Sequence, residues 1–260
     1  MAILPGIEVR RYSYGERRDQ FGELTLPENT GPFAVVVLIH GGFWRARYDL
    51  RLEDPLVADL AARGWAVWNL EYRRLGVRSS GGWPATFEDV AAGIDRLGSL
   101  EEPLDLATVL AVGHSAGGHL AFWAAARPGL PAGVPGAEPG VRLAGAVAQA
   151  GVVDLREADR LGLSGGVVLS LMHGPPGKHP GRYDVASPIE RVPVVVPQLL
   201  VHGEADDVVP PAIARRYHER AAEAGDACEL VMLPGVGHME HLEPQSGAWE
   251  AVVRWLEARR

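Results

Sequence analysis

The stretch Gly113-His114-Ser115-Ala116-Gly117 places a serine between an expected strand and an expected helix. Residues 107–112 are an apolar run typical of a buried strand, and residues 119–126 carry a helical pattern. Small flanking residues let the chain turn sharply, so the serine hydroxyl is exposed at the tip of the turn. This arrangement predicts a nucleophile at Ser115.

The rest of the chain alternates apolar runs with amphipathic segments. We expect strands at residues 34–39, 65–72, 143–150, 198–202 and 228–233, and helices at residues 51–63, 84–97, 212–224 and 245–259. Residues 8–14 and 21–27 alternate polar and apolar side chains, which predicts an antiparallel hairpin at an edge. Strands that alternate with helices predict an α/β fold of three layers, with a mostly parallel central sheet covered on both faces.

Residues 152–197 interrupt this rhythm. They are rich in Gly and Pro and contain one short apolar patch, residues 167–172. Because so long a connection is unusual within a compact domain, we interpret this segment as a small cap-like insertion over a binding site. We expect residues 1–260 to form a single domain that includes this insertion.

The bulk composition limits the partners. A net charge of −8 argues against binding to nucleic acid or to an anionic membrane surface. The N-terminal residues do not resemble a signal peptide and no apolar run is long enough to span a membrane, so a cytoplasmic location is the default expectation. The oligomeric state is open, with a homodimer as one alternative.

The chain has one cysteine and nine histidines, and these residues decide whether a disulfide bond or a metal site is expected. Cys228 alone cannot form an intrachain disulfide, and it lies in an apolar run where a small core residue is expected. The histidines lack a spacing typical of zinc ligands. We therefore expect no metal and no organic cofactor.

A serine hydroxyl needs an adjacent base, and that base needs an orienting acid. Downstream of Ser115, the acids of residues 202–210 follow an apolar strand, and His238 follows another. Loops after the carboxyl ends of parallel strands meet at one edge of a sheet, so we expect these groups to meet there. His241 is the other histidine in this region, and we interpret it as a rim or surface residue.

An earlier loop, His40-Gly41-Gly42-Phe43-Trp44, follows the strand expected at residues 34–39. Its glycines leave backbone N–H groups free to point at an oxygen that becomes negative when serine attacks a carbonyl. We assign Gly42 and Phe43 as donors in this oxyanion hole. The N–H of Ala116, at the start of the next helix, is the third donor.

With these motifs the chain resembles the α/β-hydrolase serine esterases and lipases, near the bacterial esterase, feruloyl-esterase-like and kynurenine formamidase-like branches. The shared motifs cover most of residues 34–240: His40-Gly41-Gly42-Phe43-Trp44, Glu71-Tyr72-Arg73-Arg74, Pro84 with Glu88-Asp89-Val90, the Ser115 turn, Ala186-Ser187-Pro188, His202-Gly203 with Asp206 and Pro210, and Gly237-His238. The resemblance implies an α/β-hydrolase fold. Two glycines followed by Phe43 depart from the three-glycine pattern of hormone-sensitive-lipase relatives and match the formamidase-like and feruloyl-esterase-like members better.

In relatives with the His-Gly-x-x-Asp pattern, the first aspartate is the catalytic acid, which implies Asp206 here with Asp207 as the fallback. The resemblance then implies a serine hydrolase that cleaves esters of small or medium acyl groups through an acyl-enzyme on Ser115. The alternatives are an arylformamidase, which cleaves an N-formyl group with the same residues, a peptidase-like hydrolase and a hydrolase-fold receptor without turnover. The expected partner is a small-molecule ester or amide.

Other side chains near these motifs have two interpretations each. Trp44, Trp83 and Met172 either line a substrate pocket or pack in the core or at its rim. We expect His40 and His202 to stiffen loops by binding backbone groups, His114 to pack in the turn and His119 to be an ordinary helix residue. The arginines of the same region are interpreted as solvated or structurally paired rather than substrate-binding: Arg45, Arg47, Arg73 and Arg74.

Overall fold

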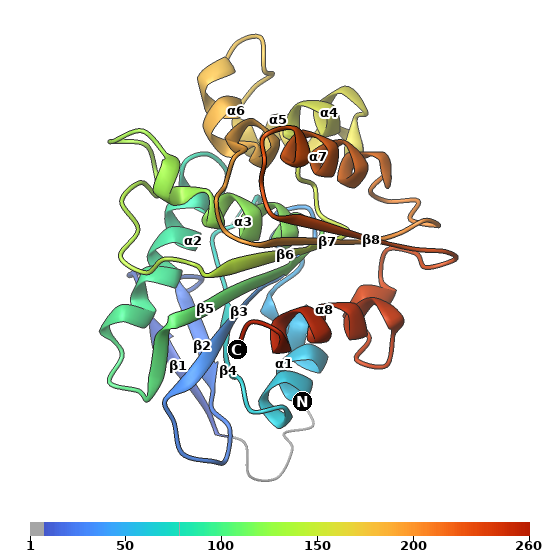
Figure 1. The fold of residues 1–260 in the computed structure, drawn as a ribbon. Helices are drawn as coiled ribbons and strands as arrows, with labels where there is room; N and C mark the ends of the chain where they lie inside the picture. Colours follow the sequence, from blue (N-terminus) through green and yellow to red (C-terminus); the bar gives the residue numbers. More distant parts are fainter. Residues whose placement is uncertain (1–7, 78) are drawn as a thin grey trace.

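The computed structural model describes residues 8–77 and 79–260, and the strands among them form one sheet (Figure 1). In chain order they are β1 (Val9–Ser13), β2 (Phe21–Thr25), β3 (Phe33–Ile39), β4 (Ala66–Leu70), β5 (Leu104–His114), β6 (Gly145–Gln149), β7 (Gln198–Gly203) and β8 (Cys228–Leu233). Their order across the sheet is β1-β2-β4-β3-β5-β6-β7-β8. β1 and β2 form the predicted antiparallel hairpin, β2 pairs antiparallel with β4, and all other pairs are parallel.

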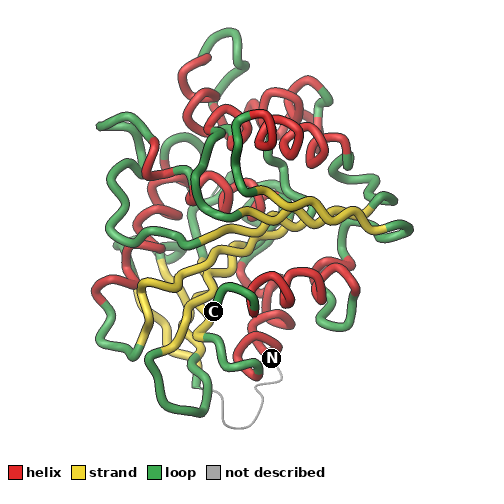
Figure 2. The backbone as a smooth tube through the Cα atoms, viewed as in Figure 1, coloured by secondary structure: helices red, strands yellow, loops and turns green. Residues whose placement is uncertain are grey.

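Helices cover both faces of this sheet, as the tube in Figure 2 shows. One face carries α1 (Asp54–Ala62) and α8 (Gly247–Glu257). The other face carries α2 (Ala85–Asp95), α3 (Ala116–Ala125) and α7 (Ala212–Glu223). The architecture therefore has the three layers predicted from the alternation of strands and helices.

The central strand β3 explains why the sheet needs two helical layers. Successive side chains on a strand point to opposite faces, and all seven residues of β3 are buried. Val35, Val37 and Ile39 belong to the core beneath α2, α3 and α7, whereas Val36 and Leu38 belong to the core beneath α1 and α8. A continuous apolar run thus fills two cores at once.

The helix ends differ from the expected ends by a few residues. The helix expected from residue 51 begins with a 3₁₀ turn, η1 (Leu50–Glu53), before α1 starts at Asp54. Gly64, which follows α1 closely, has φ +88°, a conformation that glycine adopts without strain. α8 begins after Ser246, whose hydroxyl accepts a hydrogen bond from the Trp249 amide at 3.1 Å.

Residues 152–197 form short helices between β6 and β7: α4 (Leu155–Arg160), α5 (Leu163–Met172), α6 (Pro180–Ala186) and the 3₁₀ turn η4 (Pro188–Arg191). They lie near α7 on the same face of the sheet (Figure 1). Val168, Leu171 and Tyr183 are completely buried in the same core as α3. The segment is therefore packed onto the main body, and its role as a cap stays a prediction.

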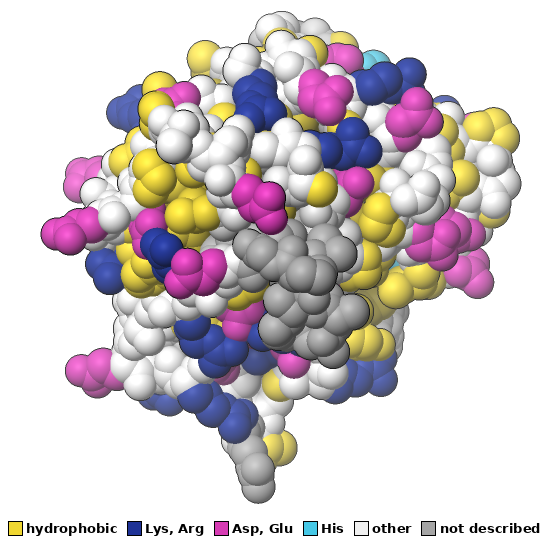
Figure 3. Space-filling model, turned by 90° about the horizontal axis from the view of Figure 1, so that it is seen from below, with side chains coloured by type: hydrophobic (Ala, Val, Ile, Leu, Met, Phe, Trp, Pro, Cys, Tyr) yellow, Lys and Arg dark blue, Asp and Glu magenta, His cyan; other side chains and the backbone are white. Residues whose placement is uncertain are grey.

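The sequence predicts no membrane-spanning segment and a core position for Cys228. Among the described residues, no helix combines the length and apolar character that crossing a bilayer requires. Figure 3 shows one face of the molecule, on which acidic and basic side chains are interspersed. Cys228 is partly buried at the start of β8 and packs against the core, and burial raises the pKa of its thiol to about 12.

Candidate active site

Ser115 occupies the sharp turn between β5 and α3, as predicted. Its backbone has φ +55° and ψ −117°, an unusual conformation for a residue with a side chain. The neighbouring glycines have no space for a larger residue. A Cβ on Gly113 would lie 2.1 Å from the carbonyl oxygen of Gly117, and one on Gly117 would lie 1.8 Å from that of Ile39. The turn therefore depends on both glycines.

The loop after β3 lies directly against this turn. A Cβ on Gly41 would lie 3.2 Å from the Ser115 Cβ and 2.8 Å from the His114 carbonyl oxygen. Gly42, Phe43 and Trp44 then have φ values of +100°, +53° and +55°. Ala116 is the first residue of α3, where a backbone N–H has no partner within the helix. Gly41 and Ala116 thus adjoin Ser115, and the other two predicted oxyanion donors, Gly42 and Phe43, follow Gly41 directly in the chain.

The loops that follow β7 and β8 bring the acid and the histidine together. A Cβ on Gly203 would lie 2.0 Å from the Val236 carbonyl oxygen, and the Ala205 amide donates to that same oxygen at 3.0 Å. The Asp206 Oδ2 and the His238 Nδ1 are 2.8 Å apart, and both side chains are buried. Asp207 is exposed. The acid bonded to His238 is therefore Asp206, the first aspartate of the motif.

The Asp206 carboxylate is held by several donors. Its Oδ1 accepts hydrogen bonds from the Val208 and Val209 amides at 2.9 Å each, and the His202 Nε2 lies 3.2 Å from its Oδ2. Burial alone would raise the pKa of the Asp206 carboxyl. Hydrogen bonds from His202, His238 and the Val209 amide outweigh burial and hold that pKa well below its usual range. Asp206 therefore stays ionised beside His238.

His114 links the serine turn to His238. Its Nε2–H donates to the His238 carbonyl oxygen at 2.8 Å, and the two rings lie 4.6 Å apart. Desolvation lowers the pKa of His114 well below its usual range, so the ring is neutral. Ser115 and His238 therefore share one edge of the sheet. Within residues 8–77 and 79–260, no hydrogen bond joins the Ser115 hydroxyl to the His238 ring.

The expectation for His241 was wrong. This side chain is not at the surface but completely buried, because the 3₁₀ turn η5 (Glu240–Leu242) directs it inward. The Gln149 side chain donates to the His241 carbonyl oxygen at 2.9 Å and holds the turn in place. Burial lowers the pKa of His241 to about 4. Sequence reasoning missed this role of Gln149, since a glutamine at the end of a strand carries no motif.

Two of the three predicted pocket residues are core residues. Trp44 is completely buried, and its indole N–H donates to the His119 Nδ1 at 3.2 Å. Met172 is completely buried too, so neither side chain has surface that could contact a substrate, and packing is the correct interpretation. Trp83 is partly buried and packs edge-on against Phe87, with ring centroids 5.1 Å apart. Trp83 remains a candidate for substrate contact.

The histidines at the strand ends behave as predicted. The His202 Nε2–H donates to the Val209 carbonyl oxygen at 2.9 Å. The His40 ring lies 2.8 Å from the Gly41 carbonyl oxygen and 3.0 Å from a Glu71 carboxylate oxygen. These contacts stiffen the loops that follow β3 and β7. His119 was predicted to be an ordinary helix residue, but its ring connects two other groups. The ring accepts a hydrogen bond from the Trp44 indole N–H and lies 2.9 Å from the Ala186 carbonyl oxygen.

The arginines near the early loop divide into two pairs. Arg73 pairs with Asp89 at 2.7 Å and Arg74 with Glu71 at 3.3 Å, as predicted for structural residues. Arg45 instead donates to the Ser164 carbonyl oxygen at 2.7 Å, and Arg47 lies over the Tyr48 ring.

No group of three or more His, Cys, Asp or Glu side chains within the described ranges is arranged to hold a metal ion.

Comparison with known sequences gives one family and two curated relatives. The model of the BD-FAE family matches residues 23–220. Esterase LipQ of Mycobacterium tuberculosis is 30% identical over 217 residues, which is 78% of this chain and 49% of LipQ. Esterase LipC of the same organism is 29% identical over 248 residues, which is 89% of this chain and 60% of LipC. The chain thus spans about half the length of these relatives.

Comparison with solved structures shows the fold. A bifunctional GH43-CE protein from Bacteroides eggerthii superposes with a TM-score of 0.80 at 23% identity, over 96% of this chain and 38% of that chain. The thermophilic esterase Est2 of Thermogutta terrifontis superposes with a TM-score of 0.73 at 22% identity, over 98% of this chain and 91% of that chain. The α/β-hydrolase fold predicted from the sequence is confirmed.

Proposed function

Since the chain belongs to the BD-FAE family, we propose that it is a serine hydrolase that cleaves carboxylic esters of small or medium acyl groups. One observation carries this proposal. A buried histidine–aspartate pair, with 2.8 Å between His238 Nδ1 and Asp206 Oδ2, lies at the same sheet edge as the strained Ser115 turn. A serine made nucleophilic by such a pair is suited to acyl transfer.

The reaction begins when the Ser115 Oγ attacks the ester carbonyl carbon. His238 takes the hydroxyl proton on Nε2, because its Nδ1–H is held by Asp206. The ionised Asp206 stabilises the imidazolium that forms. The carbonyl oxygen becomes an oxyanion, which accepts hydrogen bonds from the N–H groups of Gly42, Phe43 and Ala116.

The intermediate then collapses, and the imidazolium gives its proton to the leaving alcohol. An acyl group remains bound to the Ser115 oxygen. Water enters, loses a proton to His238 and attacks the acyl carbon. The bond between that carbon and the Ser115 oxygen then breaks, and the imidazolium returns its proton to this oxygen, which releases the acid and restores the serine hydroxyl. Each oxyanion donor contributes on the order of 3 kcal/mol to lowering the barrier.

The Ser115→Ala variant tests the proposal with 4-nitrophenyl acetate and 4-nitrophenyl butyrate as substrates. Removing the nucleophile should lower kcat/KM by about 10⁴-fold or more while circular dichroism stays unchanged. Ser99→Ala, at an exposed serine outside the site, is the matched control and should keep full activity. Activity that survives in Ser115→Ala would reject the assignment.

A second substrate separates the ester and formamide alternatives. N-formylkynurenine carries the N-formyl group that an arylformamidase cleaves with the same residues. We expect the 4-nitrophenyl esters to be the better substrates by kcat/KM. Ser115-dependent turnover of N-formylkynurenine without turnover of either ester would assign the protein as an arylformamidase instead.

A further inference from the structure

A groove of about 390 Å³ opens beside the loop that carries the proposed oxyanion donors. It is lined by residues 45–47, by Leu75 and Gly76, and by Val167 and Ser170 of α5. Its walls thus come from three places: the continuation of the early loop, the segment after β4 that carries Leu75 and Gly76, and the insertion at residues 152–197 that we predicted to cover a binding site.

Backbone hydrogen bonds fix this groove next to the oxyanion loop. The Arg45 amide donates to the Gly42 carbonyl oxygen at 3.0 Å, and the Leu75 amide donates to that of Trp44 at 2.6 Å. Arg45 is two residues after Phe43, so their Cα atoms are at most about 7 Å apart. The groove therefore begins two residues after a proposed oxyanion donor.

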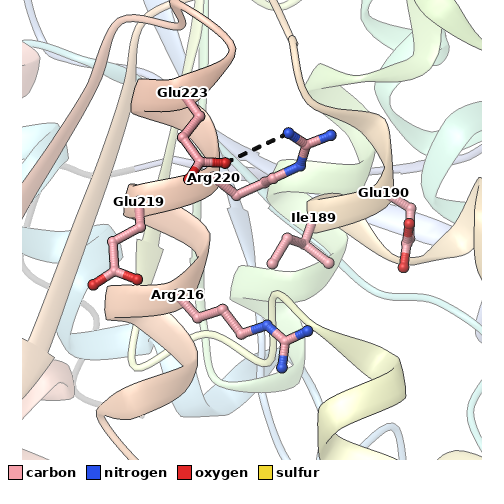
Figure 4. Close-up of a pocket in the computed structure, with 6 residues that line it drawn as sticks. All are labelled: Ile189, Glu190, Arg216, Glu219, Arg220 and Glu223. Carbon is pink, nitrogen blue, oxygen red and sulfur yellow. Dashed lines mark ion pairs between the residues drawn. The ribbon is translucent and has the colours of Figure 1, made fainter.

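The charge in this groove is uncompensated. None of its lining residues carries a carboxylate, and neither Arg45 nor Arg47 forms an ion pair with any residue of the described ranges 8–77 and 79–260. A second cavity of about 310 Å³, between η4 and α7, shows the contrast (Figure 4). There Arg220 lies 3.7 Å from Glu223, and Arg216 lies 3.3 Å from Asp154. Within the described residues, the two arginines that line the groove thus lack a carboxylate partner, in a chain of net charge −8.

Arg45 is also held in place. Its Nη2 donates to the Ser164 carbonyl oxygen at 2.7 Å, which ties the early loop to α5 and leaves other N–H groups of the guanidinium for a ligand. Ser164, Gly165 and Gly166 all have positive φ, so this carbonyl lies in a tight left-handed turn. The Arg47 guanidinium lies 4.6 Å from the centre of the Tyr48 ring. Because such anchoring reduces the entropy lost on binding, it favours a ligand site.

We propose that this groove is an anion subsite that binds a carboxylate of the substrate, so that the preferred esters carry a negative charge away from the scissile bond. This proposal rests on the proposed function. A guanidinium matches a carboxylate with two parallel N–H···O hydrogen bonds, and the Ser170 hydroxyl adds a further donor. Leu75 and Val167 contact the carbon chain between the ester and the carboxylate.

Two pairs of matched substrates test the subsite from either side of the ester. On the acyl side, 4-nitrophenyl hemiglutarate is compared with the neutral 4-nitrophenyl valerate. On the alcohol side, 3-carboxyphenyl butyrate is compared with 3-carbamoylphenyl butyrate. In one of these pairs we expect kcat/KM to be at least about 10-fold higher for the anion, mainly through a lower KM. The pair that shows the preference identifies the side of the ester that faces the groove.

The variants Arg45→Gln and Arg47→Gln should each lower that anion-to-neutral ratio by about 10-fold. Arg47→Gln disturbs the folded protein less than Arg45→Gln does, since the Arg47 side chain is exposed. Arg254→Gln removes the same charge from an exposed site on α8, on the opposite face of the sheet, and should leave the ratio unchanged. Higher salt should reduce the preference of the unaltered protein.

The outcomes separate the two proposals. If the neutral esters are hydrolysed in a Ser115-dependent way but neither anion is preferred, the subsite is overturned and the proposed function stands. A preference that survives in both Arg45→Gln and Arg47→Gln also overturns the subsite. Absence of Ser115-dependent turnover of all four esters overturns the proposed function and the subsite with it.

Discussion

At the scale of single residues, the Asp206 carboxylate holds the site together. Two backbone amides bind one of its oxygens, and His202 and His238 contact the other. This set of donors fixes where the negative charge lies and which nitrogen of His238 carries the proton. The carboxylate therefore supports catalysis through His238 rather than by touching the substrate.

The first prediction follows from that arrangement. Asp206→Asn keeps the size of the side chain but removes its charge and can place an N–H where His238 needs an acceptor. We expect kcat to fall by about 10⁴-fold, as happens when the orienting acid of a serine hydrolase loses its charge. Asp207→Asn, at the exposed neighbour, should change kcat less than about threefold. Equal losses in both variants, measured with 4-nitrophenyl butyrate, would refute the role of Asp206.

Glu53 is a second residue with an unusual carboxyl group. It is buried at the end of η1, and burial raises its pKa to about 8, so it is protonated at pH 7. Sequence analysis missed it because a glutamate at the edge of a helical pattern normally faces water. Its contribution to the pH dependence of stability opposes that of the buried histidines.

At the scale of elements, the turn between β5 and α3 requires Gly117. An alanine there would place its Cβ 1.8 Å from the Ile39 carbonyl oxygen, so β3 or α3 would have to shift. We expect Gly117→Ala to lower the free energy of unfolding by at least about 2 kcal/mol, the size typical of overpacking in a core. Gly177→Ala is the control, since a Cβ at Gly177 meets nothing within 4 Å. Urea unfolding curves that coincide for the two variants would contradict this account.

The elements also show what the sequence could predict. Each expected strand and helix exists, because an apolar run or an apolar face must be buried wherever it occurs. The Ser115 turn, the early glycine loop and the Asp206–His238 pair follow strand ends, so the parallel topology alone brings them to one edge. Local motifs were thus sufficient for Ser115 and His238, whereas the choice of Asp206 over Asp207 came from the resemblance to a family.

Other residues could not be placed from local pattern. His241 points inward because it lies within η5, which turns it towards the core, and Trp44 and Met172 are completely buried as well. The groove at Arg45 and Arg47 likewise forms only where the early loop meets α5. Burial and the absence of a counter-ion depend on tertiary contacts, which periodicity does not encode.

At the scale of the whole molecule, buried titratable groups predict how stability depends on pH. Burial lowers the pKa of His119 and of His241 to about 4 each, and the pKa of His114 lies well below its usual range. Between about pH 4.5 and 6.5, each of these histidines is neutral when folded and protonated when unfolded. The unfolded state then binds more protons, so the free energy of unfolding falls as the pH falls through this range.

Glu53 acts in the opposite direction in the same range, since it is protonated when folded and ionised when unfolded. Three histidines outweigh one glutamate, so a net loss of stability towards acid remains. Each group contributes a slope of about 1.4 kcal/mol per pH unit at most. His119→Gln should therefore flatten the loss between pH 6.5 and 4.5, and Glu53→Gln should steepen it. Urea unfolding at several pH values measures both slopes, and changes of the same sign in the two variants would contradict the assignment.

The central claim is that His238 and Asp206 activate the Ser115 hydroxyl, and covalent trapping tests it most directly. The protein is treated with a fluorophosphonate, and the labelled peptide is identified by mass spectrometry. The account predicts one adduct per chain, on Ser115, with labelling slowed by orders of magnitude in His238→Ala. Adduct formation at another residue, or ester hydrolysis that continues after Ser115 is fully labelled, would contradict it.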